Sequence, residues 1–308
     1  MTDQQGCGFE GCCGRRGGNN SAGRSGSSRL IDARMPELAR CLTLFQYVQA
    51  VTGGPVARID QAGSYAQPSL RGEAFAVRPG SIALRIDGAG IDTAVVARDG
   101  DTDSVTLRLL DASGRTVHQG RLLSEGDRLL VGLAPTVRAG ARTAVESAPP
   151  EVPAWEDGDQ LAQLDAVLTD GGVARRAAFH RYRGGEHRPI EIDVVASVLD
   201  HVCSVGLPIG VAVFAPAAMQ ACAGRVHVTD RTVGGRVFAA LAESSVEIDL
   251  AGVRACHLVR SAAAHGPTSA LELDDADGQC VAVITQFGMV GADVHAAWED
   301  LAASLSDA

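Results

Sequence analysis

The side chains with the clearest chemical potential lie in the segment ARRAAFHRYRGGEHR, residues 174–188. Two histidines, His180 and His187, stand there among five arginines that include Arg183, with two aromatic residues interleaved. A histidine can bond a metal ion, and guanidinium groups pair with anionic groups, so the segment is a candidate ligand site. The alternative is a solvated helix end and loop whose charges face water.

Other chemical signatures are missing from the sequence. It contains no GxSxG, no P-loop, no HExxH and no GxGxxG after a strand. The eight cysteines form no CxxC pair, and Cys7, Cys12 and Cys13 match no standard zinc spacing. The other five stand in apolar contexts, where we expect reduced, buried side chains.

Composition excludes two broad classes of partner. The 308 residues carry a net charge of −10, and all 27 basic residues are arginines. An acidic chain without an extended basic block is a poor ligand for nucleic acid, because phosphate contacts supply most of that affinity. No run of 18 apolar residues occurs, and the N-terminus has no apolar signal core. We therefore expect no membrane insertion and a cytoplasmic location.

The chain divides by composition into four stretches. Residues 1–30 are rich in Gly, Ser and Cys and are predicted to be a disordered tail. Residues 137–154 contain Pro149, Pro150 and Pro153, which indicate a linker. The predicted structured parts are therefore 31–136 and 155–308.

Hydrophobic spacing indicates a mixture of helices and strands. Helices are predicted at 159–168, 174–181, 194–205 and 292–304, and alternation predicts a strand at 81–87. Residues 40–51 are predicted to form a strand pair or one bent strand, whereas residues 57–77 show no clear pattern. The turn DADG at 275–278 is predicted to join two alternating strands.

The two structured parts repeat one another. A shift of 164 residues places Leu107 on Leu271, Leu109 on Leu273, Asp111 on Asp275, Gly114 on Gly278 and Val117 on Val281. A shift of 162 places Ile86 on Ile248, Asp87 on Asp249, Gly90 on Gly252 and Arg98 on Arg260. Nearer the front, residues 42–45 are matched with 211–214, and 52–56 with 222–226. The predicted fold class is α+β with two tandem repeats, each an antiparallel sheet with flanking helices, and extra helices before the second.

Several stretches resemble a known family, the cytoplasmic haem-utilisation proteins of the HemS, HmuS and ChuX type, also called haemin-degrading factors. In the second half these are GLPIGVAVF (206–214), MQACAGRV (219–226), LVRSAAAHGPTSALELDDADGQCVA (258–282) and AAWEDLAASL (296–305). In the first half they are MPELARCLTL (35–44), IALRID (82–87) and SVTLRLLDASGRTVHQGRL (104–122). The resemblance covers roughly residues 33–306.

The resemblance implies a haem held between the two halves. The family's axial histidine comes from the start of the second half, with an arginine of the first sheet nearby. Its position falls near Ala162, and other family histidines fall on Thr52 and Cys222, so none is retained. The arginine is retained as Arg85.

Five residues make up the candidate haem site: Arg85, His180, Arg183, His187 and Cys222. His180 and Cys222 are the candidate iron ligands, because imidazole and thiolate both bond haem iron. Cys222 has the alternative of a small buried core residue, and Arg85 that of an exposed strand residue. His118 and His257 are expected to be hydrogen-bonded histidines of the sheet or the core.

The predicted function is haem binding in haem-iron acquisition and transport, with a haem importer and a downstream haem oxygenase as candidate partners. If the chain is an enzyme, the resemblance implies oxygen-dependent haem degradation, in which the haem supplies the chemistry. One alternative is a non-haem interaction or regulatory protein on the same duplicated fold. Another is binding of a different planar or anionic metabolite between the halves.

Overall fold

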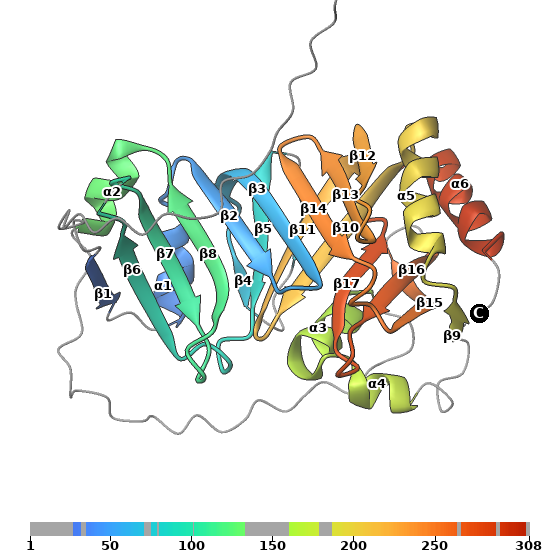
Figure 1. The fold of residues 1–308 in the computed structure, drawn as a ribbon, viewed down its shortest axis with the longest axis horizontal. Helices are drawn as coiled ribbons and strands as arrows, with labels where there is room; N and C mark the ends of the chain where they lie inside the picture. Colours follow the sequence, from blue (N-terminus) through green and yellow to red (C-terminus); the bar gives the residue numbers. More distant parts are fainter. Residues whose placement is uncertain are drawn as a thin grey trace, which may run out of the picture.

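The fold consists of two mostly antiparallel sheets, built from two copies of one unit and joined by a short parallel pairing of β3 with β5 (Figure 1). The computed structural model describes residues 27–31, 35–70, 75–78, 80–100, 102–132, 160–178, 187–263, 266–287 and 290–305. The predicted linker lies outside these residues, as does most of the predicted tail. The predicted α+β class with tandem repeats is confirmed.

The two copies contain matching elements in the same order. The first repeat comprises β1 (Ser27–Ile31), α1 (Met35–Leu42), β2 (Val48–Gly53), β3 (Ala57–Tyr65), β4 (Ser69–Leu70), β5 (Ser81–Ile86), β6 (Thr93–Arg98), β7 (Val105–Leu110), β8 (Thr116–Leu122) and α2 (Glu125–Gly132). The second comprises β9 (His187–Ile190), α5 (Val194–Val205), β10 (Pro208–Ala215), β11 (Ala218–Arg225), β12 (Val228–Arg231), β13 (Arg236–Leu241), β14 (Ser244–Asp249), β15 (Ala255–Ala263), β16 (Gly266–Asp274), β17 (Cys280–Thr285) and α6 (Ala292–Ala303). The extra helices predicted before the second repeat are α3 (Gln160–Asp170) and α4 (Val173–Ala178).

Each sheet is completed by strands of the other repeat. The first sheet has the strand order β1-β6-β7-β8-β2-β3-β14-β13-β12. The second has the order β9-β15-β16-β17-β10-β11-β5-β4. β4 and β5 of the first repeat therefore lie in the second sheet, and β12, β13 and β14 of the second repeat lie in the first. In Figure 1 β5 and β14 lie in the middle of the molecule beside β3 and β11.

The local turns confirm the repeat residue by residue. Asp111 Oδ1 accepts hydrogen bonds from the backbone N–H groups two and four residues later, and Asp275 Oδ1 does the same. Gly114 and Gly278 close these turns with φ of 79° and 72°, a left-handed conformation that favours glycine. The strand register also shifts at the same place, after Leu109 and after Leu273.

The N-terminal parts of the two repeats align differently in the structure from the alignment predicted from the sequence. Residues 42–45 lie at the end of α1 and in the following loop, whereas 211–214 lie in β10. Thr52 lies in β2 and Cys222 in β11, so those two matches are wrong. The structural shift in the β2–β3 hairpin is 161 residues, which places Gly63 (φ 155°) on Gly224 (φ 156°).

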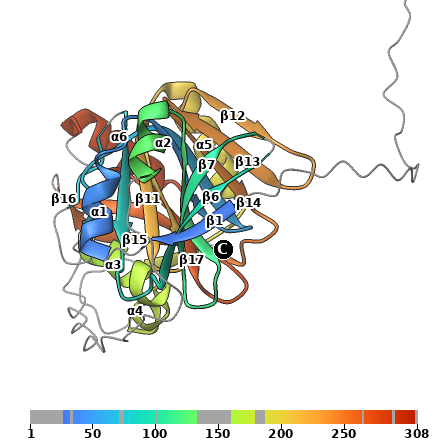
Figure 2. The same ribbon diagram turned by 90° about the vertical axis from the view of Figure 1, so that its left-hand side faces the viewer.

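Each repeat encloses its own aliphatic core. The first core is formed by α1 and the inward side chains of β2, β5, β6, β7 and β8. Figure 2 places α1 to one side of β6 and β7 at the first-repeat end. The second core is formed by α5, Trp298 of α6, and strands of both sheets. The helix predicted at 194–205 is confirmed: it buries Val195, Val198, Leu199 and Val202, and it ends at Gly206, where φ is 67°.

Two segments differ from the sequence prediction for identifiable reasons. A short helix was predicted at residues 33–38, but α1 continues to Leu42, into the apolar run from Arg40 that suggested a strand. Residues 57–65 form β3, whose exposure alternates although Asp60, Gln61 and Ser64 obscure the hydrophobic pattern. Within the described ranges, no helix is long and apolar enough to cross a membrane.

Candidate ligand-binding site

The candidate site lies on one face of the second sheet, which we call the covered face. Strand register places Arg85, Met219, Phe214, Glu272, His257 and His187 on this face. Here α3 packs across the strands, with Leu164, Val167 and Leu168 against Ala212, Met219 and Ala221. The strands beneath are consequently buried on both sides. β10 and β16 show almost continuous burial instead of alternation.

Arg85 is the most deeply buried cation of the covered face, with an exposed fraction of 0%. Its Nε and Nη2 donate to Oδ1 and Oδ2 of Asp165 on α3, at 2.6 and 2.8 Å. Nη1 donates to Ser69 Oγ at 2.8 Å, and the guanidinium carbon lies 5.7 Å from the centre of the Phe75 ring. We call Arg85 and Asp165 the seam pair. This is the geometry of a bidentate carboxylate complex.

Further polar contacts hold α3 on the sheet. Gln163 Nε2 donates to the fully buried Glu272 carboxylate, and its Oε1 accepts from Ser261 Oγ at 2.8 Å. Gln160 Nε2 reaches Thr285 Oγ1 at 3.3 Å. Their partners Glu272, Ser261 and Thr285 come from three neighbouring strands. The covered face therefore holds α3 through apolar packing and through a line of hydrogen bonds.

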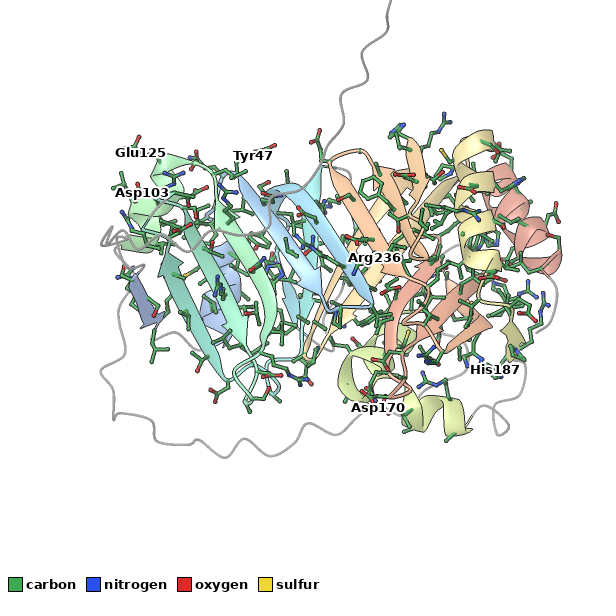
Figure 3. All side chains as sticks on the ribbon, in the orientation of Figure 1. Tyr47, Asp103, Glu125, Asp170, His187 and Arg236 are labelled. Carbon is green, nitrogen blue, oxygen red and sulfur yellow. The ribbon has the colours of Figure 1, made fainter. Side chains whose placement is uncertain are left out.

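The other end of the covered face carries His187 of β9 and His257 of β15, which we call the edge pair. His187 Nε2 and His257 Nδ1 are 3.1 Å apart, so one donates a hydrogen bond to the other. His257 Nε2 lies 3.5 Å from Asp274 Oδ2, and Arg176 Nη1 donates to Asp274 Oδ1 at 2.9 Å. Figure 3 labels Asp170 at the end of α3 and His187 at the start of β9, on either side of α4. A carboxylate behind an imidazole is the arrangement that orients histidines bonded to metals.

A cavity of about 340 Å³ adjoins the edge pair and is lined by residues 189–193 and 254–257. The lining mixes aliphatic residues with Arg254, His257 and the carboxylates of Glu191 and Asp193. Its volume falls in the range of small-molecule pockets, about 300–1,000 Å³. His257 lies in its wall, so a ligand in this cavity would meet an imidazole.

Cys222 lies on the opposite face of the second sheet, inside the second core. Burial raises the pKa of its thiol to about 12, against a smaller lowering by a hydrogen bond from Ser244. The sulfur is therefore a neutral thiol at physiological pH, whereas iron bonds the thiolate. The described surroundings of Cys222 do not fit an iron ligand.

The network of buried hydrogen bonds around His118, which joins strands of both repeats, was not predicted from the sequence. Thr52 Oγ1 donates to Gln220 Oε1 at 2.9 Å, so it accepts from His118 Nδ1 at 2.7 Å. His118 Nε2 consequently accepts from the Tyr65 hydroxyl at 2.7 Å. Burial lowers the pKa of His118 to about 3, so its ring is neutral, with both nitrogens used inside the protein. These partners come from β2, β3, β8 and β11, and no local pattern brings them together.

The five predicted site residues do not form one cluster. Arg85 and His187 share the covered face, but β5 and β9 are six strand positions apart, about 29 Å along the sheet. Two donors to one metal lie within about 4 Å of each other, so these two cannot share an iron. His180 and Arg183 lie outside the described residues. Among the residues that are described, no group of three or more His, Cys, Asp or Glu side chains is placed to hold a metal ion.

Comparisons with known proteins support the fold. No protein-family model matches the sequence, and no curated protein matches it. Apo-PhuS, a haem-binding protein from Pseudomonas aeruginosa, matches with a TM-score of 0.68 and 18% identity, over 91% of this chain and 87% of PhuS. ChuS, a haem oxygenase from Escherichia coli, matches with a TM-score of 0.73 and 15% identity, over 90% of this chain and 88% of ChuS.

The two matches define the class of fold to which this chain belongs. Both extend over nearly the whole of each protein, so the correspondence includes both repeats. The tandem-repeat fold implied by the sequence resemblance is therefore confirmed. The chain has the fold of the haem-utilisation proteins PhuS and ChuS.

Proposed function

We propose that this chain binds haem and takes part in haem trafficking. The observation that carries the proposal is the similarity of its fold, over about nine tenths of the chain, to a haem-binding protein and a haem oxygenase. In this proposal the chain is cytoplasmic, receives haem from an importer and passes it to an oxygenase.

The edge pair is the part of the described structure that fits haem. A bound haem would need an axial donor beside a largely apolar cavity, and the edge pair offers an imidazole next to the 340 Å³ cavity. We assign His187, which contacts His257 of the cavity wall without itself lining the cavity, as the iron ligand. His257 would orient it through the 3.1 Å contact, and Asp274 would hold His257 in turn. The arginines of residues 174–188 would supply cations for the haem carboxylates.

The bound haem would supply the redox and oxygen chemistry, and this chain's residues would bind and orient it. His187 would keep the iron at one place on the sheet edge. Asp274, which is buried and paired with Arg176, would fix the ring orientation of His257. In this proposal, binding and transport of haem would therefore need no further side chain from the described residues.

Titration of the purified protein with haemin tests the proposal. We expect a sharp Soret band that saturates at one haem per chain. His187→Ala should lower the affinity at least tenfold and change the ligand-field bands, because the axial donor is lost. His201→Ala, which removes an exposed histidine of α5, is the matched control and should bind like the wild type. A broad spectrum that does not saturate would contradict haem binding, and saturable binding unaffected by His187→Ala would contradict the assigned ligand.

One observation favours the second candidate function, a non-haem interaction or regulatory protein. The arginine that the family resemblance places beside haem is here bound by Asp165, and Cys222 is in the core. Two of the five predicted haem contacts, Arg85 and Cys222, are thus occupied by interactions within the protein. Failure of all variants to take up haemin would leave this candidate as the remaining function.

A further inference from the structure

A second cavity, of about 410 Å³, lies at the end of the molecule formed by the first repeat. In Figure 1 this end carries β1, β6 and α2, whereas β9 and α6 lie at the opposite end. The described residues that line the cavity include no aspartate or glutamate. They combine three arginines with three valines of the first core: Arg29, Arg98, Arg128, Val96, Val105 and Val131. The walls are therefore both cationic and aliphatic.

Strand pairing places two of these arginines on the core side of the first sheet. Arg98 pairs with Val105 of β7, and Arg29 pairs with Val96 of β6, so the four side chains lie on one face. Val96 and Val105 belong to the first core, so this is the face that the core covers. The cavity thus lies between the edge of the sheet and α2, which contributes the third arginine.

Arg29 also fixes the position of α2. Its terminal nitrogens donate to the last carbonyls of the helix, Nη2 to Val131 and Nη1 to Gly132. Arg188 occupies the equivalent position on β9 and binds the end of α6 in the same way, with its Nη2 donating to the Ala302 oxygen at 3.0 Å. Because equivalent arginines hold the last helix of each repeat, residues of the two helices can be matched.

The matched helix positions carry opposite charges. Three residues before the carbonyl that Nη2 binds, α2 has Arg128 and α6 has Glu299. Glu299 Oε1 accepts from the Ser269 N–H at 2.7 Å, and its Oε2 accepts from Ser269 Oγ at 2.8 Å. Arg260 Nη2 lies 3.2 Å from the same Oε2. The second repeat thus holds a carboxylate of its own between the last helix and the sheet.

The first repeat keeps the arginine of the sheet but has a cation where the second repeat has this carboxylate. Arg98 pairs with Val105 as Arg260 pairs with Ser269, so the two rows of side chains are equivalent. With Arg128 on the helix above this row, the cavity lies where the carboxylate lies in the other copy.

The neighbouring groups leave the cavity cationic. Asp103, labelled at this end of the molecule in Figure 3, accepts from Arg98 Nη1 at 3.0 Å, but the two side chains are 69% and 53% exposed, so water screens the pair. The partners of Arg29 are neutral carbonyls, and Arg128 Nε donates to the Leu122 carbonyl at 3.4 Å. Three guanidinium groups beside aliphatic walls favour an anion with a hydrocarbon body.

We propose that Arg29, Arg98 and Arg128 form a binding site for an aliphatic carboxylate supplied from outside the chain. Its carboxylate takes the position that Glu299 takes in the second repeat, and its hydrocarbon body lies against the valines. The cavity volume falls within the range of small-molecule pockets, about 300–1,000 Å³. The site lies at the opposite end of the molecule from the edge pair, so it is independent of haem binding at His187.

Binding is tested on the full chain by calorimetric titration with hexanoate, with neutral hexanamide and inorganic phosphate as comparison probes. We expect saturable binding of hexanoate, no measurable binding of hexanamide, and binding of phosphate at least about tenfold weaker, because phosphate gains nothing from the valines. Arg98→Gln and Arg128→Gln should each weaken hexanoate binding at least about tenfold. Arg121→Gln, which removes an exposed arginine of β8, is the matched control and should bind like the wild type.

A transplanted carboxylate gives a sharper test. Val105→Ser/Arg128→Glu copies Ser269 and Glu299 into the first repeat and should fill the site from within. We expect this variant to lose hexanoate binding and to unfold at a higher temperature than the wild type, while its haemin titration stays unchanged. If the double variant does not fold, Arg128→Glu alone replaces it, because a single surface-facing exchange supplies the same carboxylate.

Four outcomes would overturn the proposal. They are failure of hexanoate to bind, hexanamide or phosphate binding as tightly as hexanoate, an equal loss of affinity in Arg121→Gln and Arg98→Gln, and undiminished binding of hexanoate to the variant that carries the transplanted carboxylate.

Discussion

The same register position has opposite character in the two repeats. On β5 it is Arg85, fully buried and bound by Asp165, whereas on β14 it is Glu247, half-exposed and paired with Arg236. The neighbours differ in the same way: Met219 and Ala221 flank Arg85, and Arg58 and Asp60 flank Glu247. The same scaffold position is thus solvated in one repeat and buried in the other, and the inserted α3 supplies the cover and the partner carboxylate.

The difference extends over both sheets. In the first sheet β2, β6 and β7 alternate between buried and more exposed residues, as expected of an antiparallel sheet with one face near water. In the second sheet β10, β16 and β17 are buried almost continuously because α3 covers the second face. The polar side chains that are buried on this covered face are therefore the candidates for mutational tests of function.

The largest effect should come from breaking the seam pair. Asp165→Ala leaves the Arg85 guanidinium buried without its anion, and an unpaired buried charge costs about 3–5 kcal/mol of unfolding free energy. Glu247→Ala removes the equivalent exposed pair and should cost less than about 1 kcal/mol. Urea unfolding monitored by circular dichroism measures both. Equal losses would show that the two positions do not differ energetically.

A second contrast concerns pH, because His118 of the first repeat corresponds to Ala282 of the second. Burial lowers the folded-state pKa of His118 from 6.5 to about 3. Between these values the unfolded chain binds a proton that the folded chain does not, so stability falls as pH falls below 6.5. The slope should reach about 1.4 kcal/mol for each pH unit.

Unfolding free energies measured from pH 7 to pH 4 test this contrast. His118→Gln should flatten the profile across that window, although it should also lower stability at pH 7 by disturbing the bonds to Thr52 and Tyr65. A wild-type slope retained in His118→Gln would assign the pH dependence to other groups.

The smallest contrast concerns two glycines that pack against the opposite repeat. A Cβ at Gly90 would lie 2.3 Å from Ala217 Cβ in the β10–β11 turn, whereas a Cβ at Gly252 would lie 2.9 Å from Val56 Cγ2 in the β2–β3 turn. A methyl group close to the backbone cannot move aside as a Val side chain can. Gly90→Ala should therefore cost about 1–3 kcal/mol and Gly252→Ala less. Thermal unfolding compares the two, and the reverse order would contradict the explanation.

Local features of this fold could be predicted from the sequence, because their causes are local. The aspartate and glycine of each turn at 111–114 and 275–278 determine that turn by themselves, and the apolar spacing of 194–205 followed by Gly206 determines α5. The internal repeat was visible for the same reason.

Features that depend on distant parts of the chain could not be predicted in this way. β3 lies between β2 of its own repeat and β14 of the other, and this pairing on both edges is not visible in its polar sequence. Arg85 was predicted to be a haem-site residue, with an exposed strand residue as the alternative, because nothing near it shows that Asp165, 80 residues later, would cover it. The edge pair likewise joins residues 70 positions apart.

Because β4 and β5 lie in the second sheet and β12, β13 and β14 lie in the first, neither repeat contains a complete sheet. A protease that cut the chain within 133–159 would leave two fragments, each contributing strands to the other's sheet. We expect such fragments to remain bound and to purify as one particle. A gene split at this point should give a functional product only when both pieces are made in the same cell.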